Sequence, residues 1–296
     1  MADAPVQRRG RPGWLYPLVA VAIVVVLLIA AAGAYFVNAT VTGGADHQRA
    51  TATLESGRKH NNQIHDTLTN NKLPGALSPS DDVAKAKQEV ADFQSSLQEA
   101  STTLDDDLHS LTDVDSRLKQ DATSIWLIPE KQQLARDRER VEGMISAFSS
   151  AKSAFGILHG QMTAYEALLD VIAQFDTINT FLDKGDFSGA LGAFGQLDQK
   201  MQALLTAAGG KNIPPQMGVF VTALKTLVDD LKKFVQAAQA GDVGTVQSLS
   251  AKIESEAKGL GNFDTTAMDT YEDNLLKPYK DAYEGGMKKA GFTVTG

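Results

Sequence analysis

One apolar segment, residues 17–37, constrains the fold of this chain more than any other feature. Its sequence, PLVAVAIVVVLLIAAAGAYFV, is almost wholly aliphatic and carries no charged residue. As a helix it would be roughly 31 Å long at about 1.5 Å per residue, which matches the hydrocarbon core of a bilayer. The sequence therefore predicts a transmembrane helix at residues 17–37, through which the chain contacts the lipid bilayer.

The charges beside this segment predict its orientation. Arg8, Arg9 and Arg11 precede it, and positive residues are retained on the cytoplasmic side of a membrane. We therefore expect residues 1–16 to form a short basic cytoplasmic segment. The bulk of the chain would then lie outside the cytoplasmic (inner) membrane, on the periplasmic side of a bacterial envelope, as a single-pass protein with its N-terminus inside.

A cleavable secretory signal is the alternative to a permanent signal-anchor. Ala30-Ala31-Ala32 and Ala32-Gly33-Ala34 place small residues at the spacing that signal peptidases accept. The apolar run is longer than the roughly 7–15 residues usual for a signal peptide, which favours the anchor. In both cases the body of the chain is exported, and cleavage would make it a secreted helical protein.

Four aromatic residues are candidates for the membrane interface. Trp14, Tyr16 and Tyr35 bracket the apolar segment, at the depth where amphipathic rings prefer to lie. Trp126 belongs to the apolar turn Ile125–Pro129, which would return to the headgroups if the preceding helix runs back toward the membrane. The alternative is that this turn closes the end of a helical bundle.

Composition and charge limit the partners of the exported part. The chain has 28 Lys and Arg against 36 Asp and Glu, a formal charge of −8. An acidic protein is a poor ligand for nucleic acid, so we expect no nucleic-acid partner. Cysteine is absent, which excludes disulfides and thiolate metal sites.

Residues 81–184 carry a heptad pattern that predicts two long helices. Apolar residues recur every seven positions in the first of them: Val83, Val90, Leu97, Leu104, Leu111 and Leu118. The intervening positions hold Ala86, Phe93, Ala100 and Val114, with Asp107 as an exception. The second helix repeats the pattern at Leu134, Val141, Phe148, Phe155, Met162 and Leu169. An antiparallel bundle within one chain and a parallel coiled-coil dimer both satisfy this spacing, and the repeated Pro and Gly breaks favour the bundle.

The flanking regions are also predicted to be helical. Residues 38–80 read as a polar juxtamembrane helix and linker, with a hinge at Gly43-Gly44, a helix start at Asp46, and an apolar face of Leu54, Ile64 and Leu68. Residues 185–296 read as helical hairpins and a C-terminal helix. Within them Gly185-Asp186 and Gly241-Asp242 mark two turns, and the apolar residues around these turns match at an offset of 56 positions. The predicted fold class is therefore all-α, with an elongated bundle after the anchor.

No motif predicts catalysis, a cofactor or a metal site. The five histidines show no metal-binding spacing, which suggests ordinary surface residues. The acidic cluster around Asp105, Asp106 and Asp107 suggests a solvated helix face, and the glycines from Gly185 to Gly195 suggest close helix packing. We therefore expect no enzyme, no cofactor and no metal.

The function that these features favour is scaffolding. A membrane-anchored helical surface without pocket chemistry is typical of a protein-binding platform or of an accessory subunit in a membrane or envelope complex. The rival interpretation is a ligand-sensing or ligand-binding helical bundle, whose small-molecule ligand the sequence does not identify. A buried cluster of polar residues would favour an enzyme, and apolar helix interfaces would favour the scaffold.

Overall fold

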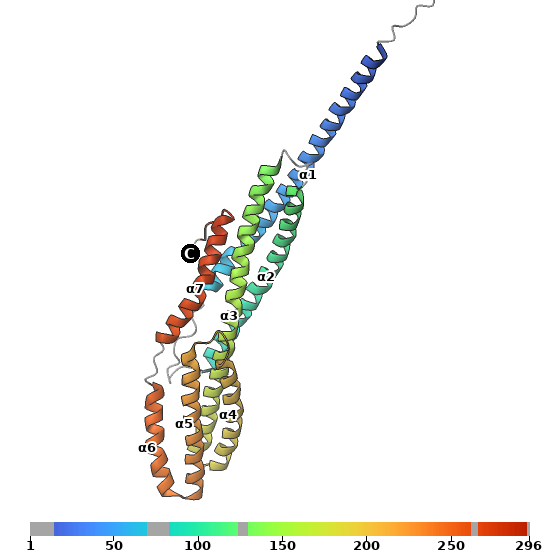
Figure 1. The fold of residues 1–296 in the computed structure, drawn as a ribbon. Coiled ribbons are helices and arrows are strands. Elements are labelled where there is room, and N and C mark those ends of the chain that lie inside the picture. Colours follow the sequence, from blue (N-terminus) through green and yellow to red (C-terminus); the bar gives the residue numbers. More distant parts are fainter. Residues whose placement is uncertain (1–14, 70–82, 124–129, 262–265, 295–296) are drawn as a thin grey trace, which may run out of the picture.

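The chain forms a long rod of helices in the computed structural model (Figure 1). The structure describes residues 15–69, 83–123, 130–261 and 266–294, and only the backbone of residues 15–36, 38, 39, 123 and 269. The described residues form seven helices and no strand. The all-α prediction and the helical bundle are therefore confirmed.

Helix α1, Leu15–Thr69, runs without a break from the apolar segment into the rod (Figure 1). Its apolar face is the predicted one, since Leu54, Ile64 and Leu68 are buried. The predicted hinge at Gly43-Gly44 and the predicted helix start at Asp46 are wrong. A Cβ on Gly43 would lie 2.7 Å from the Glu130 side chain, so this glycine lets α1 pack closely against the start of α3.

Helices α2, Val83–Thr123, and α3, Lys131–Asp183, follow the heptad pattern. The seven-residue series beginning at Val90 and at Leu134 are buried along both helices. Because α1 and α3 of the same chain cover α2, the pattern is satisfied within one chain as an antiparallel bundle. Asp46 of α1 lies beside Asp121 of α2, and His60 lies beside Asp107, so α1 and α2 run in opposite directions.

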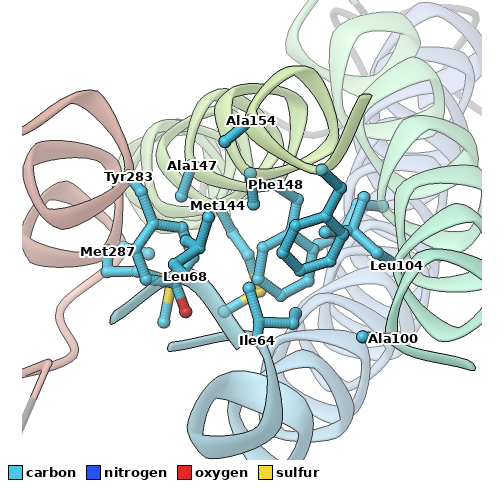
Figure 2. Close-up of a cluster of buried hydrophobic side chains, with 14 of the residues drawn as sticks. Ile64, Leu68, Ala100, Leu104, Met144, Ala147, Phe148, Ala154, Tyr283 and Met287 are labelled. Atoms are coloured by element: carbon cyan, nitrogen blue, oxygen red, sulfur yellow. The ribbon is translucent and has the colours of Figure 1, made fainter. Parts of the chain in front are cut away.

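Helix α7, Thr266–Lys289, completes this part of the rod by packing against α3 and α1. Its approach to α3 is close because two glycines face each other: a Cβ on Gly286 would lie 2.6 Å from the Gly143 carbonyl oxygen. We call residues 43–69, α2, the first half of α3 and α7 the proximal bundle. Figure 2 shows its core, to which all four helices contribute, including Leu104, Phe148 and Tyr283.

The far end of the rod consists of two helical hairpins. The end of α3 and α4, Phe187–Ala208, form the first hairpin, whereas α5, Pro215–Ala240, and α6, Val243–Gly261, form the second. Gly185 and Gly241 adopt φ angles of 70° and 73° at the two turns, a left-handed conformation that favours glycine. The predicted pair of glycine turns is therefore confirmed.

The transmembrane prediction rests on residues that the structure describes only in part. Among the described side chains, no helix is long and apolar enough to cross a membrane. The side chains of residues 17–36 lie outside that description. The transmembrane helix at residues 17–37 therefore has no support from the structure and stays a prediction.

Candidate functional site

The most unusual feature of the proximal bundle is a row of polar side chains on the inner face of α1. Asp46, Asn61 and His65 are buried, and His47 and His60 each contact a buried carboxylate of another helix. We call these five residues the polar seam. Buried polar groups destabilise a fold unless they are paired, so the partners of the seam determine how α1 is held.

Two histidines of the seam bind aspartates of the neighbouring helices. His47 Nδ1 lies 2.6 Å from Asp137 Oδ2 of α3, and His60 Nδ1 lies 2.7 Å from Asp107 Oδ2 of α2. Both aspartates occupy heptad positions that otherwise carry apolar residues, and both are at most 7% exposed. A shift of α1 along the bundle by one turn would leave both carboxylates buried without a hydrogen-bond partner. The pairs therefore fix the register of α1.

A third contact joins two carboxyl groups. Asp121 of α2 hydrogen-bonds Asp46 of α1, and its pKa is raised from 3.8 to about 6, first by burial and then by the hydrogen bond and charge of Asp46. The charges of Arg117 and Arg49 act in the opposite direction. Because the folded-state pKa lies above the ordinary value, the contact stabilises the fold fully below pH 3.8 and loses its contribution as the pH rises through about 6.

A fourth contact connects α1 to the end of the chain. The Tyr283 hydroxyl of α7 donates to Asn61 Oδ1 over 2.6 Å, and burial raises the pKa of this phenol above its ordinary value. Tyr283 is also one of the largest fully buried side chains, and its ring packs in the core shown in Figure 2. The seam thus binds α1 to each of the three helices around it.

This arrangement connects α1 to the helices around it. Within the part of the chain that the structure describes, no group of three or more His, Asp or Glu side chains gathers where a metal ion would bind. The imidazoles of His47 and His60 and the carboxyl group of Asp46 form hydrogen bonds between helices. Their chemistry is therefore that of a clamp on α1.

The four predicted interface residues are not tested by this geometry. Trp14 and Trp126 lie outside the described residues, and of Tyr16 and Tyr35 only the backbone is described, as part of α1. Their interface role stays a prediction. The polar seam, in contrast, was missed by the sequence analysis.

The sequence analysis interpreted several polar residues wrongly. His65 is buried, whereas histidines were expected on the surface, and Asp107 faces inward in a cluster expected to be solvated. The available signal was the interruption of the heptad pattern by Asp107, and by Asp137 one helix later, because a carboxylate at a core position requires a buried partner. Of the glycines near the first turn, Gly189 packs closely, with its Cβ position 2.5 Å from Phe181. Close packing was the wrong expectation for Gly185, Gly192 and Gly195, because nothing lies within 4 Å of their Cβ positions.

Comparison with known proteins adds no relative. The chain matches no family model, no curated protein and no solved structure.

Proposed function

We propose that this protein is a membrane-anchored helical scaffold, or a non-catalytic accessory subunit, of a membrane or envelope complex. The segment at residues 17–37 anchors it in the cytoplasmic (inner) membrane with the N-terminus inside. The helical rod stands on the extracytoplasmic side and contacts a protein partner of the same membrane or envelope.

The observation that carries this proposal is the continuity of α1. Helix α1 contains the apolar segment, and from Gly43 to Thr69 the same helix is one of the four helices of the proximal bundle. The polar seam and the packing of Gly43 against Glu130 hold that helix in the bundle. A rod that shares a helix with its anchor keeps its surface at a set distance from the bilayer, which raises its effective concentration for partners in that membrane.

Fractionation of cells that produce the full chain tests the anchor. We expect the protein in the membrane pellet after alkaline carbonate extraction, at its full mass, with the rod digested by protease added outside spheroplasts. Val24→Arg with Leu28→Arg is the matched control, since each charge at the centre of the segment costs about 2.5–3.5 kcal/mol of insertion free energy. A protein released from spheroplasts at reduced mass would contradict the anchor and favour cleavage and secretion.

Purification in mild detergent tests the partner. A membrane or envelope protein recovered in stoichiometric amount with the full chain, and lost on extraction at high detergent, would support the scaffold or accessory role. A full chain that is recovered alone, and that forms a stable dimer by light scattering, would contradict it.

A further inference from the structure

The structure places segments of three helices at the end of the rod where α1 enters it. We propose that this end, built from residues 43–46 of α1, residues 121–123 of α2 and residues 130–132 of α3, rests on the phospholipid headgroups of the bilayer. This inference rests on the proposed function, since it takes residues 17–37 to span the membrane.

The first argument is the length of α1 between the anchor and the bundle. The predicted span ends at Val37, and among the side-chain positions of α1 that the structure describes, Gly43 is the first that is buried. The intervening part of the helix is therefore roughly 9 Å long at about 1.5 Å per residue. The headgroup layer on each side of a bilayer is about 5–8 Å thick, from a total of about 40–45 Å and a core of about 30 Å. The end of the bundle thus begins where the headgroup layer ends.

The second argument is that α2 and α3 reach the same level as Gly43. Asp121, two residues before the end of α2, contacts Asp46, and Glu130, directly before α3, lies against Gly43. Neither helix stops short of this level. The end of the rod is therefore a face of three helix segments and not the tip of α1 alone.

The third argument is the chemistry of the exposed section of α1. Val37 and Val41 are each 66% exposed and lie four residues apart, on one side of the helix. Of the four large apolar residues that the described part of the chain exposes, Val37 is thus the last residue of the anchor and Val41 lies one turn beyond it, where the headgroup layer would cover it. Lys131 at the start of α3 is exposed, and a long amine can reach phosphate oxygens while its stem stays against the protein.

The charge of this end predicts whether the contact depends on anionic lipid. Asp46, Asp121 and Glu130 lie beside Arg49 and Lys131, so the face has no net positive potential to attract anionic lipid. The contact follows from the length of α1. We therefore expect it equally on neutral phosphatidylcholine vesicles.

The experiment uses the full chain with a single reporter. The natural sequence contains no cysteine, so Lys131→Cys and, at the far end of the rod, Gln239→Cys each accept one fluorophore. The proteins are reconstituted in phosphatidylcholine vesicles that contain a lipid with a nitroxide on its headgroup. We expect several-fold stronger quenching of the label at position 131 than of the label at position 239. Equal quenching at both positions, in protein that floats with the vesicles, would overturn this inference and leave the anchor intact.

A length variant tests the cause. Inserting about two helical turns of alanine after Thr42, which adds roughly 10 Å to α1, should lower quenching at position 131 to the level seen at position 239. Quenching that the insertion leaves unchanged would contradict the argument from length. If the parent protein does not float with vesicles at all, the proposed anchor fails, and the present inference fails with it.

Discussion

Helices α4 and α6 occupy equivalent places in two successive hairpins, yet α4 is a core helix and α6 is not. The hairpins are related by the offset of 56 positions. Helix α4 buries seven residues, whereas none of the residues of α6 is buried. The two hairpins therefore show which features depend on local residues, such as the turns, and which depend on neighbouring helices, such as burial.

The two turns share the same backbone and N-cap hydrogen bonds, and Asp242 also accepts a bond from the Thr245 hydroxyl over 2.6 Å. Asp186 donates its backbone N–H to the Phe181 carbonyl, and Asp242 donates to the equivalent Ala237 carbonyl, each over 2.9 Å. Both aspartates then accept from the backbone N–H three residues on, Gly189 and Thr245. Each is an N-cap after a left-handed glycine. A local motif of two residues thus produces the same turn twice.

A polar contact also recurs at the same offset. In the first hairpin, Gln174 Nε2 donates to Gln196 Oε1 over 3.3 Å. At the equivalent positions of the second, Asp230 pairs with Lys252, with Asp230 Oδ2 2.5 Å from the amine. We call these contacts the amide clasp and the charged clasp. Each joins the two helices of its hairpin.

The difference arises at the outer face of the second helix in each hairpin. Phe194 and Met201 of α4 are buried in a cluster that α3, α4 and α5 share, and the equivalent residues of α6 are Ser250 and Ala257, both exposed. Among the described residues, α6 packs mainly against α5. Small and polar residues on an outermost helix are typical of the terminal unit of a helical array, so α6 closes the array.

The largest effect is expected from a core truncation at matched positions. Leu197→Ala in α4 should lower the free energy of unfolding by about 2–5 kcal/mol, and Ile253→Ala in α6 by about 1 kcal/mol. Leu197 is fully buried and Ile253 only half-buried. Urea unfolding in detergent, followed by circular dichroism, measures both. Equal losses would show that α6 is covered in solution as α4 is.

The next effect concerns the charged clasp. Asp230→Asn should cost about 1–3 kcal/mol, because it removes hydrogen bonds between charged groups. The amines of Lys252 and Lys233 lower the pKa of Asp230 from 3.8 to about 2. Since the folded-state pKa is the lower one, the stabilisation is present above pH 3.8 and is lost as the pH falls through about 2. The free energies of unfolding of the parent protein and of Asp230→Asn should therefore become equal as the pH falls through about 2.

A double variant tests the equivalence of the two clasps. Asp230→Asn with Lys252→Gln replaces the charged clasp by an amide pair like Gln174 and Gln196. We expect this variant to be more stable than Asp230→Asn alone, since it also removes the Lys252 charge that the single substitution leaves unmatched, whereas the exposed Lys233 amine stays in both. In the double-mutant cycle formed by Asp230→Asn, Lys252→Gln and the double variant, additive losses of stability would argue against a direct interaction between Asp230 and Lys252.

A smaller and equal effect is expected at the two N-caps. Asp186→Ala and Asp242→Ala should each cost about 1 kcal/mol, because each removes the same acceptor from a helix start. Asp→Asn at each position is the control, since asparagine also caps. A larger loss for Asp186→Ala would mean that tertiary packing contributes to the first turn, since only Asp242 has the additional bond from the Thr245 hydroxyl.

The smallest change in stability is expected when α6 receives the outer face of α4. Ser250→Phe with Ala257→Met should alter the free energy of unfolding by about 0.5 kcal/mol or less, as exposed substitutions do. The new apolar face should instead promote self-association, visible as a rise in mass by light scattering. A monomer of greatly increased stability would show that another part of the chain already covers this face.

Much of the fold could be predicted from periodicity. The heptads of α2 and α3, the apolar face of α1 and the two glycine turns all follow from spacing, because a helix repeats every 3.6 residues and side chains seven apart share one side. The polar seam could not be predicted in the same way. The partners of His47 and Asn61 are Asp137 and Tyr283, far along the chain, and spacing carries no information about such pairs.

Gly43 shows why a local signal misled. Two adjacent glycines weaken an isolated helix, which predicted a hinge. In the protein the missing side chain is what allows Glu130 to pack against α1, and the packing offsets the low helix propensity. The same residue type therefore ends a helix at Gly185 and lies inside one at Gly43.

Residues within one or two helical turns of each other specify the helical class of this protein, the apolar faces of its long helices and the two glycine turns. Contacts between distant helices specify which polar side chains are buried, how α1 continues into the bundle, and why α4 is covered while α6 is not. Burial depends on which other helix covers a face, and at these places the covering residues come from distant parts of the chain.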